Sequence, residues 1–275
     1  MEQAITIGES TQLCGVLSRP VDINIHKPLV IVINSGLLRR TGPFRLYVNL
    51  CRKIVETGLA AYRFDLSGIG DSERRNESMS RESQHFKDIE ETLDFFEKTH
   101  SIHTFIIMGI CTGADNCHRA MVKDERIIGA VCIDGYSYPT LKYYQTYYLQ
   151  RLFKLSVWKN LIKRLVFKSN KVATVGKADR AKDERKLNYR WTLPDKSRTR
   201  ADYQKFIKRG ARLLCVFTAS WPYNYQNQMA DAFRGLDFSN TISLEFMEDA
   251  EHTFPIVEDR KILINKILLW LNKYF

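Results

Sequence analysis

The sequence predicts an α/β protein: a mostly parallel sheet of eight strands with helices on both faces. Apolar runs of strand length alternate with helical patterns, which is typical of such a sheet. The run LVIVIN at 29–34 is apolar throughout, as expected of a strand buried on both sides. The length of 275 residues suits one domain that carries an insertion. No apolar stretch of membrane-spanning length occurs, so an integral membrane protein is not expected.

Each element is predicted from its hydrophobic pattern. Short apolar or alternating runs predict strands over 4–8, 13–17, 29–34, 59–64, 104–108, 127–133, 212–217 and 241–247. Apolar residues at helical spacing predict helices over 44–56, 84–98, 112–122 and 260–271.

The positive charge is concentrated in one segment. The chain has a formal net charge of +11, and residues 151–212 hold 20 Lys and Arg against 5 Asp and Glu. The region between the sixth and seventh strands also breaks the alternation, and its first half places apolar residues at helical intervals between basic ones. We therefore expect a core formed by 1–136 and 212–275, with a helical basic cap inserted over 137–211.

Several classes of protein are not expected. The start, MEQAITIGES, lacks the basic and apolar regions of a secretory signal, which predicts a cytoplasmic protein. The six cysteines form no C-x-x-C pair, which argues against a disulfide framework or a structural zinc site. No nucleic-acid motif accompanies the basic segment. The G-x-G within DLSGIGDS lacks a third glycine, so it predicts a turn and not a phosphate-binding loop. No cofactor and no metal are expected. The oligomeric state is left open.

The most specific motif is G-x-C-x-G at 109–113, between an apolar strand and a helix. In the G-x-S-x-G nucleophile elbow, the glycines permit a sharp turn that presents the central side chain at a helix N-terminus. Cys111 is at that position, and a helix N-terminus favours a reactive thiolate. The motif also occurs by chance around buried cysteines in tight turns.

His252 is the candidate general base. It lies in EDAEHTF, between the last strand and the last helix. A nucleophile followed by a histidine near the C-terminus is the order that this type of hydrolase requires.

With these motifs the chain resembles the α/β-hydrolase superfamily, and within it exosortase-associated and serine-aminopeptidase-like hydrolases. The resemblance covers 28–138 and 212–275 and rests on RFDLSGIGDS, MGICTG and EDAEHTF. It implies an oxyanion hole formed by the backbone N–H groups of Leu37 and Thr112. It also implies that the insertion is a cap over the active site.

Two residues depart from the family pattern. Cysteine replaces the serine nucleophile, and a thioester intermediate suits transfer to amines or alcohols as well as to water. The segment after the seventh strand, 218–225, has no carboxylate to orient the histidine. The candidates for this role are Asp134, then Asn224, then Asp231.

The sequence therefore predicts a Cys-His-(Asp/Asn) enzyme that acts on an acyl ester or thioester, either as an acyltransferase or as a thioesterase or esterase. The basic cap predicts a substrate carried on an acyl carrier protein or coenzyme A, with Lys159, Lys163 and Arg164 as contacts. A solvated basic surface or binding to a membrane surface would use the same residues. The alternative function is a catalytically impaired scaffold that binds a ligand.

Overall fold

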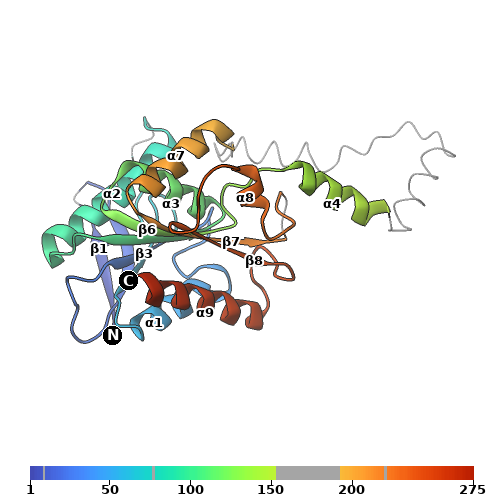
Figure 1. Cartoon of the computed structure of the whole chain (residues 1–275). Helices are drawn as coiled ribbons and strands as arrows, with labels where there is room; N and C mark the ends of the chain where they lie inside the picture. The colour runs from blue at the N-terminus through green and yellow to red at the C-terminus, as the bar shows by residue number, and fades with distance from the viewer. Residues whose placement is uncertain (9, 76–77, 153–192, 220–221) are drawn as a thin grey trace, which may run out of the picture.

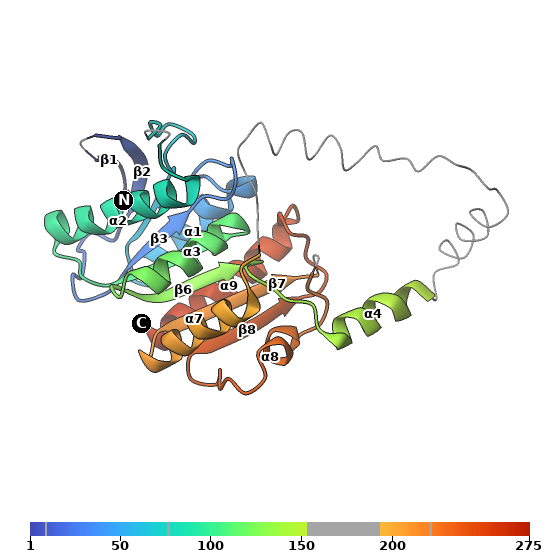
Figure 2. The same ribbon diagram turned by 90° about the horizontal axis from the view of Figure 1, so that it is seen from above.

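The computed structural model describes residues 1–8, 10–75, 78–152, 193–219 and 222–275. They contain an eight-stranded sheet in the order β1-β2-β4-β3-β5-β6-β7-β8 (Figures 1 and 2). β1 and β2 pair antiparallel with each other, β2 pairs antiparallel with β4, and the other neighbours are parallel. This arrangement confirms the predicted fold class.

The strands lie within a few residues of their predicted bounds. They are β1 (Glu2–Ile7), β2 (Leu13–Ser18), β3 (Leu29–Ile33), β4 (Ala61–Phe64), β5 (Phe105–Ile110), β6 (Ile127–Ile133), β7 (Arg212–Thr218) and β8 (Ile242–Met247). The helices are η1 (Pro43–Arg45), α1 (Leu46–Val55), α2 (Arg81–His100), α3 (Thr112–Lys123), α4 (Leu141–Leu152), α7 (Lys196–Lys208), α8 (Gln228–Ala232) and α9 (Val257–Tyr274).

Hydrophobic clusters fill both faces of the sheet. α2, α3 and α7 cover one face, and α1 and α9 cover the other (Figure 1). On α9, Leu263, Ile267, Trp270 and Leu271 are buried, and their spacing places them on one side of the helix. The layers hold the carboxyl ends of the parallel strands at one edge, where ligands bind in open α/β sheets.

The helix predicted over 44–56 begins later than expected. Phe44 and Arg45 have positive φ angles of 47° and 61°, so η1 forms first and α1 starts at Leu46. Apolar periodicity alone does not reveal this kink, because the local backbone geometry sets it.

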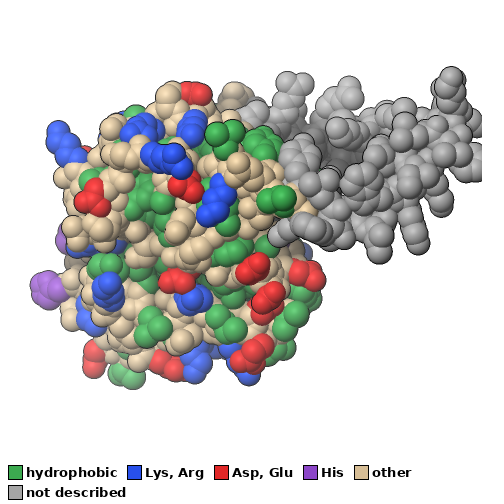
Figure 3. Space-filling model, turned by 45° about the vertical axis from the view of Figure 1, so that its right-hand side comes forward, with side chains coloured by type: hydrophobic (Ala, Val, Ile, Leu, Met, Phe, Trp, Pro, Cys, Tyr) green, Lys and Arg blue, Asp and Glu red, His purple; other side chains and the backbone are tan. Residues whose placement is uncertain are grey.

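The predicted insertion 137–211 is described in two parts. α4 extends beyond the edge of the sheet, and α7 lies on the same face as α3 (Figures 1 and 2). On α7, Thr199, Tyr203 and Phe206 are buried at helical spacing within an otherwise polar helix. Lys159, Lys163, Arg164 and most of the basic segment lie outside the described residues. On the face shown in Figure 3, basic and acidic side chains are interspersed.

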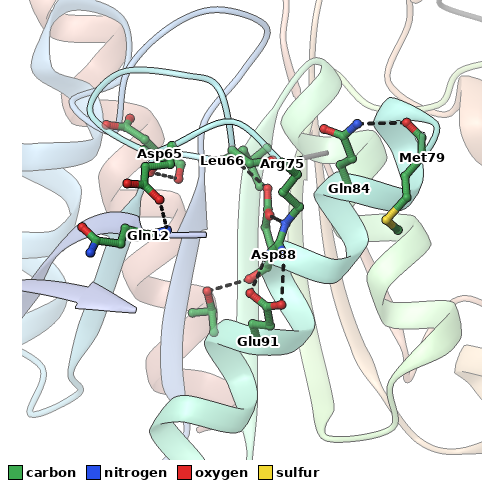
Figure 4. A network of polar contacts seen from close by, with 12 residues as sticks. Gln12, Asp65, Leu66, Arg75, Met79, Gln84, Asp88 and Glu91 are labelled. Carbon is green, nitrogen blue, oxygen red and sulfur yellow. Dashed lines mark hydrogen bonds and ion pairs between the residues drawn. The ribbon is translucent and has the colours of Figure 1, made fainter. Parts of the chain in front are cut away.

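A buried ionic network fixes the loop between β4 and α2. Arg75 lies between Asp88 and Glu91 and forms ion pairs with both (Figure 4). Asp88 also accepts a hydrogen bond from the N–H of Ser67 at 2.7 Å. Asp65 accepts hydrogen bonds from the N–H of Arg40 and, at 3.3 Å, from that of Asp71. These contacts hold residues 65–72 in a tight turn.

In the part of the chain that the structure describes, we find no helix that is both long and apolar enough to span a bilayer.

Candidate active site

β5 leads into α3 through a sharp turn at Cys111. This residue has φ 55° and ψ −120°, a strained conformation for a residue with a Cβ atom. A Cβ at Gly109 would lie 2.4 Å from the carbonyl carbon of Gly113, and one at Gly113 would lie 3.1 Å from the oxygens of Ile33 and Asn34. Both glycines therefore allow α3 to pack closely on the sheet. The geometry is that of an elbow that projects the Cys111 side chain at the helix N-terminus.

Cys111 is a partly exposed residue directly after the carboxyl end of β5. Its backbone N–H donates to the oxygen of Ile133 at 2.8 Å, which joins the turn to the end of β6. All six cysteines are free. Cys14 and Cys111 are partly exposed and the other four are buried.

Asp134 and His252 meet beside this turn, although 118 residues separate them. The Nδ1 of His252 lies 2.7 Å from Oδ2 of Asp134. Thr218, at the end of β7, donates its N–H to Oδ1 and its hydroxyl to Oδ2 of Asp134, both at 2.7 Å. The Asp134 side chain is 7% exposed, so the carboxylate is buried and held by three donors.

His252 also faces the Cys111 side chain. The hydrogen bond with Asp134, followed by that with Cys111, raises the pKa of His252 to about 10, while partial burial acts in the opposite direction. These contacts favour the protonated form of the imidazole. The three predicted residues Cys111, His252 and Asp134 are brought together.

The other candidate orienting residues lie elsewhere. Asn224 donates its Nδ2 to the oxygen of Tyr143 at 3.2 Å, and its backbone N–H donates to the side chain of Gln228 at 3.0 Å. Asp231 accepts a hydrogen bond from Tyr225 at 2.9 Å. Of the three, Asp134 is the one with a hydrogen bond to His252.

The loop after β3 is attached to the elbow. Leu37 is 60% exposed, within a turn closed by a hydrogen bond from the N–H of Leu38 to the oxygen of Ser35. The N–H of Gly36 donates to the hydroxyl of Thr112 at 2.7 Å. Thr112 is the first residue of α3, so its own N–H has no acceptor within the helix.

Tyr47 is a buried polar residue that the sequence did not single out. Its hydroxyl lies 3.2 Å from the Ser35 hydroxyl and 3.2 Å from the nitrogen of Ile110, next to Cys111. A tyrosine on the apolar face of a predicted helix could have suggested a polar contact, but not its partners.

Among the described residues, no group of three His, Cys, Asp or Glu side chains is placed to hold a metal ion. The groups that converge at the elbow are a thiol, an imidazole and a carboxylate. A thiol, an imidazole and a carboxylate in this order are chemically able to pass a proton between a nucleophile and a leaving group.

Comparisons with known proteins agree with the fold. Among solved structures, an esterase from Pyrococcus furiosus superposes with a TM-score of 0.62 at 10% identity, over 99% of this chain and 91% of that chain. An α/β serine hydrolase without a lid from Xanthomonas campestris superposes with a TM-score of 0.59 at 13% identity, over 100% of this chain and 95% of that chain. Mouse α/β hydrolase domain-containing protein 10 superposes with a TM-score of 0.57 at 14% identity, over 99% of this chain and 100% of that chain. No curated protein matches the sequence.

Residues 27–211, more than half of the chain, match the model of the family described as serine aminopeptidase, S33. This range includes Cys111 and Asp134 and ends before His252. The chain therefore belongs to the S33 serine aminopeptidase family and has the α/β-hydrolase fold.

Proposed function

We propose that the protein is a cysteine-nucleophile enzyme that cleaves an acyl ester or thioester through an acyl-enzyme thioester. The family and fold support a hydrolase of the esterase type. The observation that carries the finer proposal is the convergence of Cys111, His252 and Asp134 at a strained elbow. Backbone strain of this kind clusters at functional sites.

In this mechanism, Cys111 attacks the acyl carbonyl carbon while its proton resides on His252. Asp134 stabilises the imidazolium and fixes its orientation through Nδ1. The N–H groups of Leu37 and Thr112 stabilise the oxyanion. His252 then donates its proton to the leaving group, and the acyl group remains on sulfur as a thioester.

Exposed apolar side chains on the loops that follow β3 and β8, which also carry Leu37 and His252, support an acyl substrate. Leu37, Phe44 and Ile256 are each more than half exposed. Arg260 stacks over the Phe44 ring and donates to the oxygen of Phe254, which brings the loops after β3 and β8 together. An acyl chain in contact with this rim would remove apolar surface from water.

The second step can use water or a bound nucleophile. Water would give an esterase or thioesterase, and an amine or alcohol would give an acyltransferase. Acyl carrier protein and coenzyme A thioesters remain the predicted donors, on the basis of the basic segment in the sequence.

The test is intact-mass analysis after exposure to activated acetate esters and to acyl thioesters of coenzyme A and acyl carrier protein, with and without amines. We expect one acyl adduct on Cys111 that Cys111→Ala abolishes and His252→Ala slows by at least about 100-fold. Cys14→Ala is the matched control, because Cys14 is the other partly exposed thiol. An adduct that forms no faster on Cys111 than on Cys14 would instead support the binding-scaffold alternative.

A further inference from the structure

We propose that Tyr47 is a positioning residue that, together with Ser35, holds the two oxyanion-stabilising N–H groups at their working separation. This inference rests on the proposed function. It assigns a role in that reaction to a side chain that is buried on α1.

Tyr47, Ser35 and Ile110 form a closed ring of hydrogen bonds. The oxygen of Ile110 can only accept, so the Ser35 hydroxyl donates to it at 2.6 Å. The Ser35 oxygen can then accept from the Tyr47 hydroxyl at 3.2 Å. The N–H of Ile110 donates to the Tyr47 oxygen at 3.2 Å and completes the ring. Each member donates once and accepts once, so the donor directions are fixed.

The ring is removed from water. Tyr47 is 1% exposed and Ser35 is 7% exposed. Burial raises the pKa of Tyr47 well above its ordinary value, so the hydroxyl keeps its proton and remains a donor. A buried ring of satisfied hydrogen bonds is rigid, because breaking one bond leaves polar groups without partners.

The ring joins the two segments that carry the N–H groups. Ser35 is two residues before Leu37, and Ile110 is two residues before Thr112. A second bond, from the N–H of Gly36 to the Thr112 hydroxyl, ties the same segments at another point. Two separate hydrogen-bonded connections restrict both the distance between the segments and their rotation. Donors that are already in place lower the barrier to oxyanion formation.

A purely structural role predicts a different response from a positioning role. If the ring only adds stability, its loss should affect every reaction of Cys111 alike or none. If it positions the N–H groups, its loss should slow only those reactions that form an oxyanion. Acylation by an activated ester forms an oxyanion, whereas alkylation by iodoacetamide is a displacement at carbon and forms none.

The experiment compares both reactions in the wild type, Tyr47→Phe, Ser35→Ala and the double variant. Acylation by p-nitrophenyl acetate and alkylation by iodoacetamide are followed by intact mass on Cys111. We expect acylation to fall about 10-fold in each single variant, less than the ~100-fold that loss of a whole oxyanion donor costs. Alkylation should stay within about twofold of the wild type, which also shows that the variant is folded around the thiol.

The double variant tests whether the two side chains act as one unit. Because either substitution opens the same ring, the acylation rate of the double variant should match that of the single variants. Tyr62→Phe is the control. It removes a hydroxyl from another buried tyrosine, which lies 3.5 Å from the oxygen of Ile5 in the core cluster on the opposite face of the sheet, and it should change neither rate.

Three results would overturn the inference. Acylation at the wild-type rate in Tyr47→Phe and Ser35→Ala would show that the ring does not position the donors. Equal losses of acylation and alkylation would show a general structural role. A wild type that forms no acyl adduct on Cys111 would overturn the proposed function first, and this inference with it.

Discussion

Replacing Cys111 by glycine is expected to give a more stable protein than replacing it by alanine. The φ of 55° and ψ of −120° at this residue cost about 1–3 kcal/mol when a Cβ is present. Alanine keeps this cost and glycine removes it. Against this gain, glycine loses about 0.5–1 kcal/mol through the greater freedom of its unfolded chain. Glycine also lacks the methyl group of alanine, whose burial contributes up to about 0.8 kcal/mol. The free energy of unfolding of Cys111→Gly should therefore be larger than that of Cys111→Ala by about 1 kcal/mol.

The assay is urea denaturation of both variants, with a second pair at Glu90 as the control. Glu90 is exposed within α2, where glycine costs about 1 kcal/mol relative to alanine. The two glycine-minus-alanine differences should therefore have opposite signs and lie about 2 kcal/mol apart. If glycine destabilises residue 111 as much as residue 90, the turn is not strained, and strain gives no support to a catalytic elbow.

Three further predictions concern the candidate active site. Cys111→Ser should lose at least about 100-fold in kcat/KM at neutral pH, because a serine hydroxyl needs His252 as a base, whereas the hydrogen bond with Asp134, the largest cause of the raised pKa of His252, stays in the variant and favours the protonated imidazole. Esterase kinetics within tenfold of the wild type would contradict this. Asp134→Asn removes the largest contribution to the raised pKa of His252. The stability that this raised pKa provides is fully present below the ordinary value of 6.5 and is lost as the pH rises through about 10. The difference in unfolding free energy between wild type and Asp134→Asn should therefore shrink over that range in guanidinium titrations, and a constant difference would exclude this coupling. Thr218→Val should lower kcat about 3- to 10-fold with KM unchanged, because one donor to the Asp134 carboxylate is lost. Thr218→Ser should retain the wild-type kcat, and equal losses in both variants would indicate a packing effect.

Local sequence patterns were sufficient to predict most strands and helices of the fold. The strand over 127–133 was predicted with the bounds that β6 has, because its apolar run ends sharply on both sides. The pattern did not predict α7, where three buried residues are spread among polar ones. Nor did it place the start of α1, where Phe44 and Arg45 adopt positive φ angles that neither residue type favours.

The candidate site was predicted in part, and the reasons are physical. Cys111 lies in a local motif whose glycines carry the signal. The choice between Asp134 and Asn224 depends on which of them reaches His252, a contact across 118 residues that no local pattern encodes. The same holds for the ring of Tyr47 and Ser35, which exists only once α1 and two strand ends have packed together.

The distribution of the six cysteines also has a practical use. Four are enclosed within the folded chain, and Cys14 and Cys111 are partly open to solvent. A Cys14→Ser protein would therefore retain a single addressable sulfur, at its natural position beside the imidazole. A thiol-reactive fluorophore would therefore compete with an acyl donor for Cys111, and the fraction of protein that stays unlabelled would report acyl occupancy.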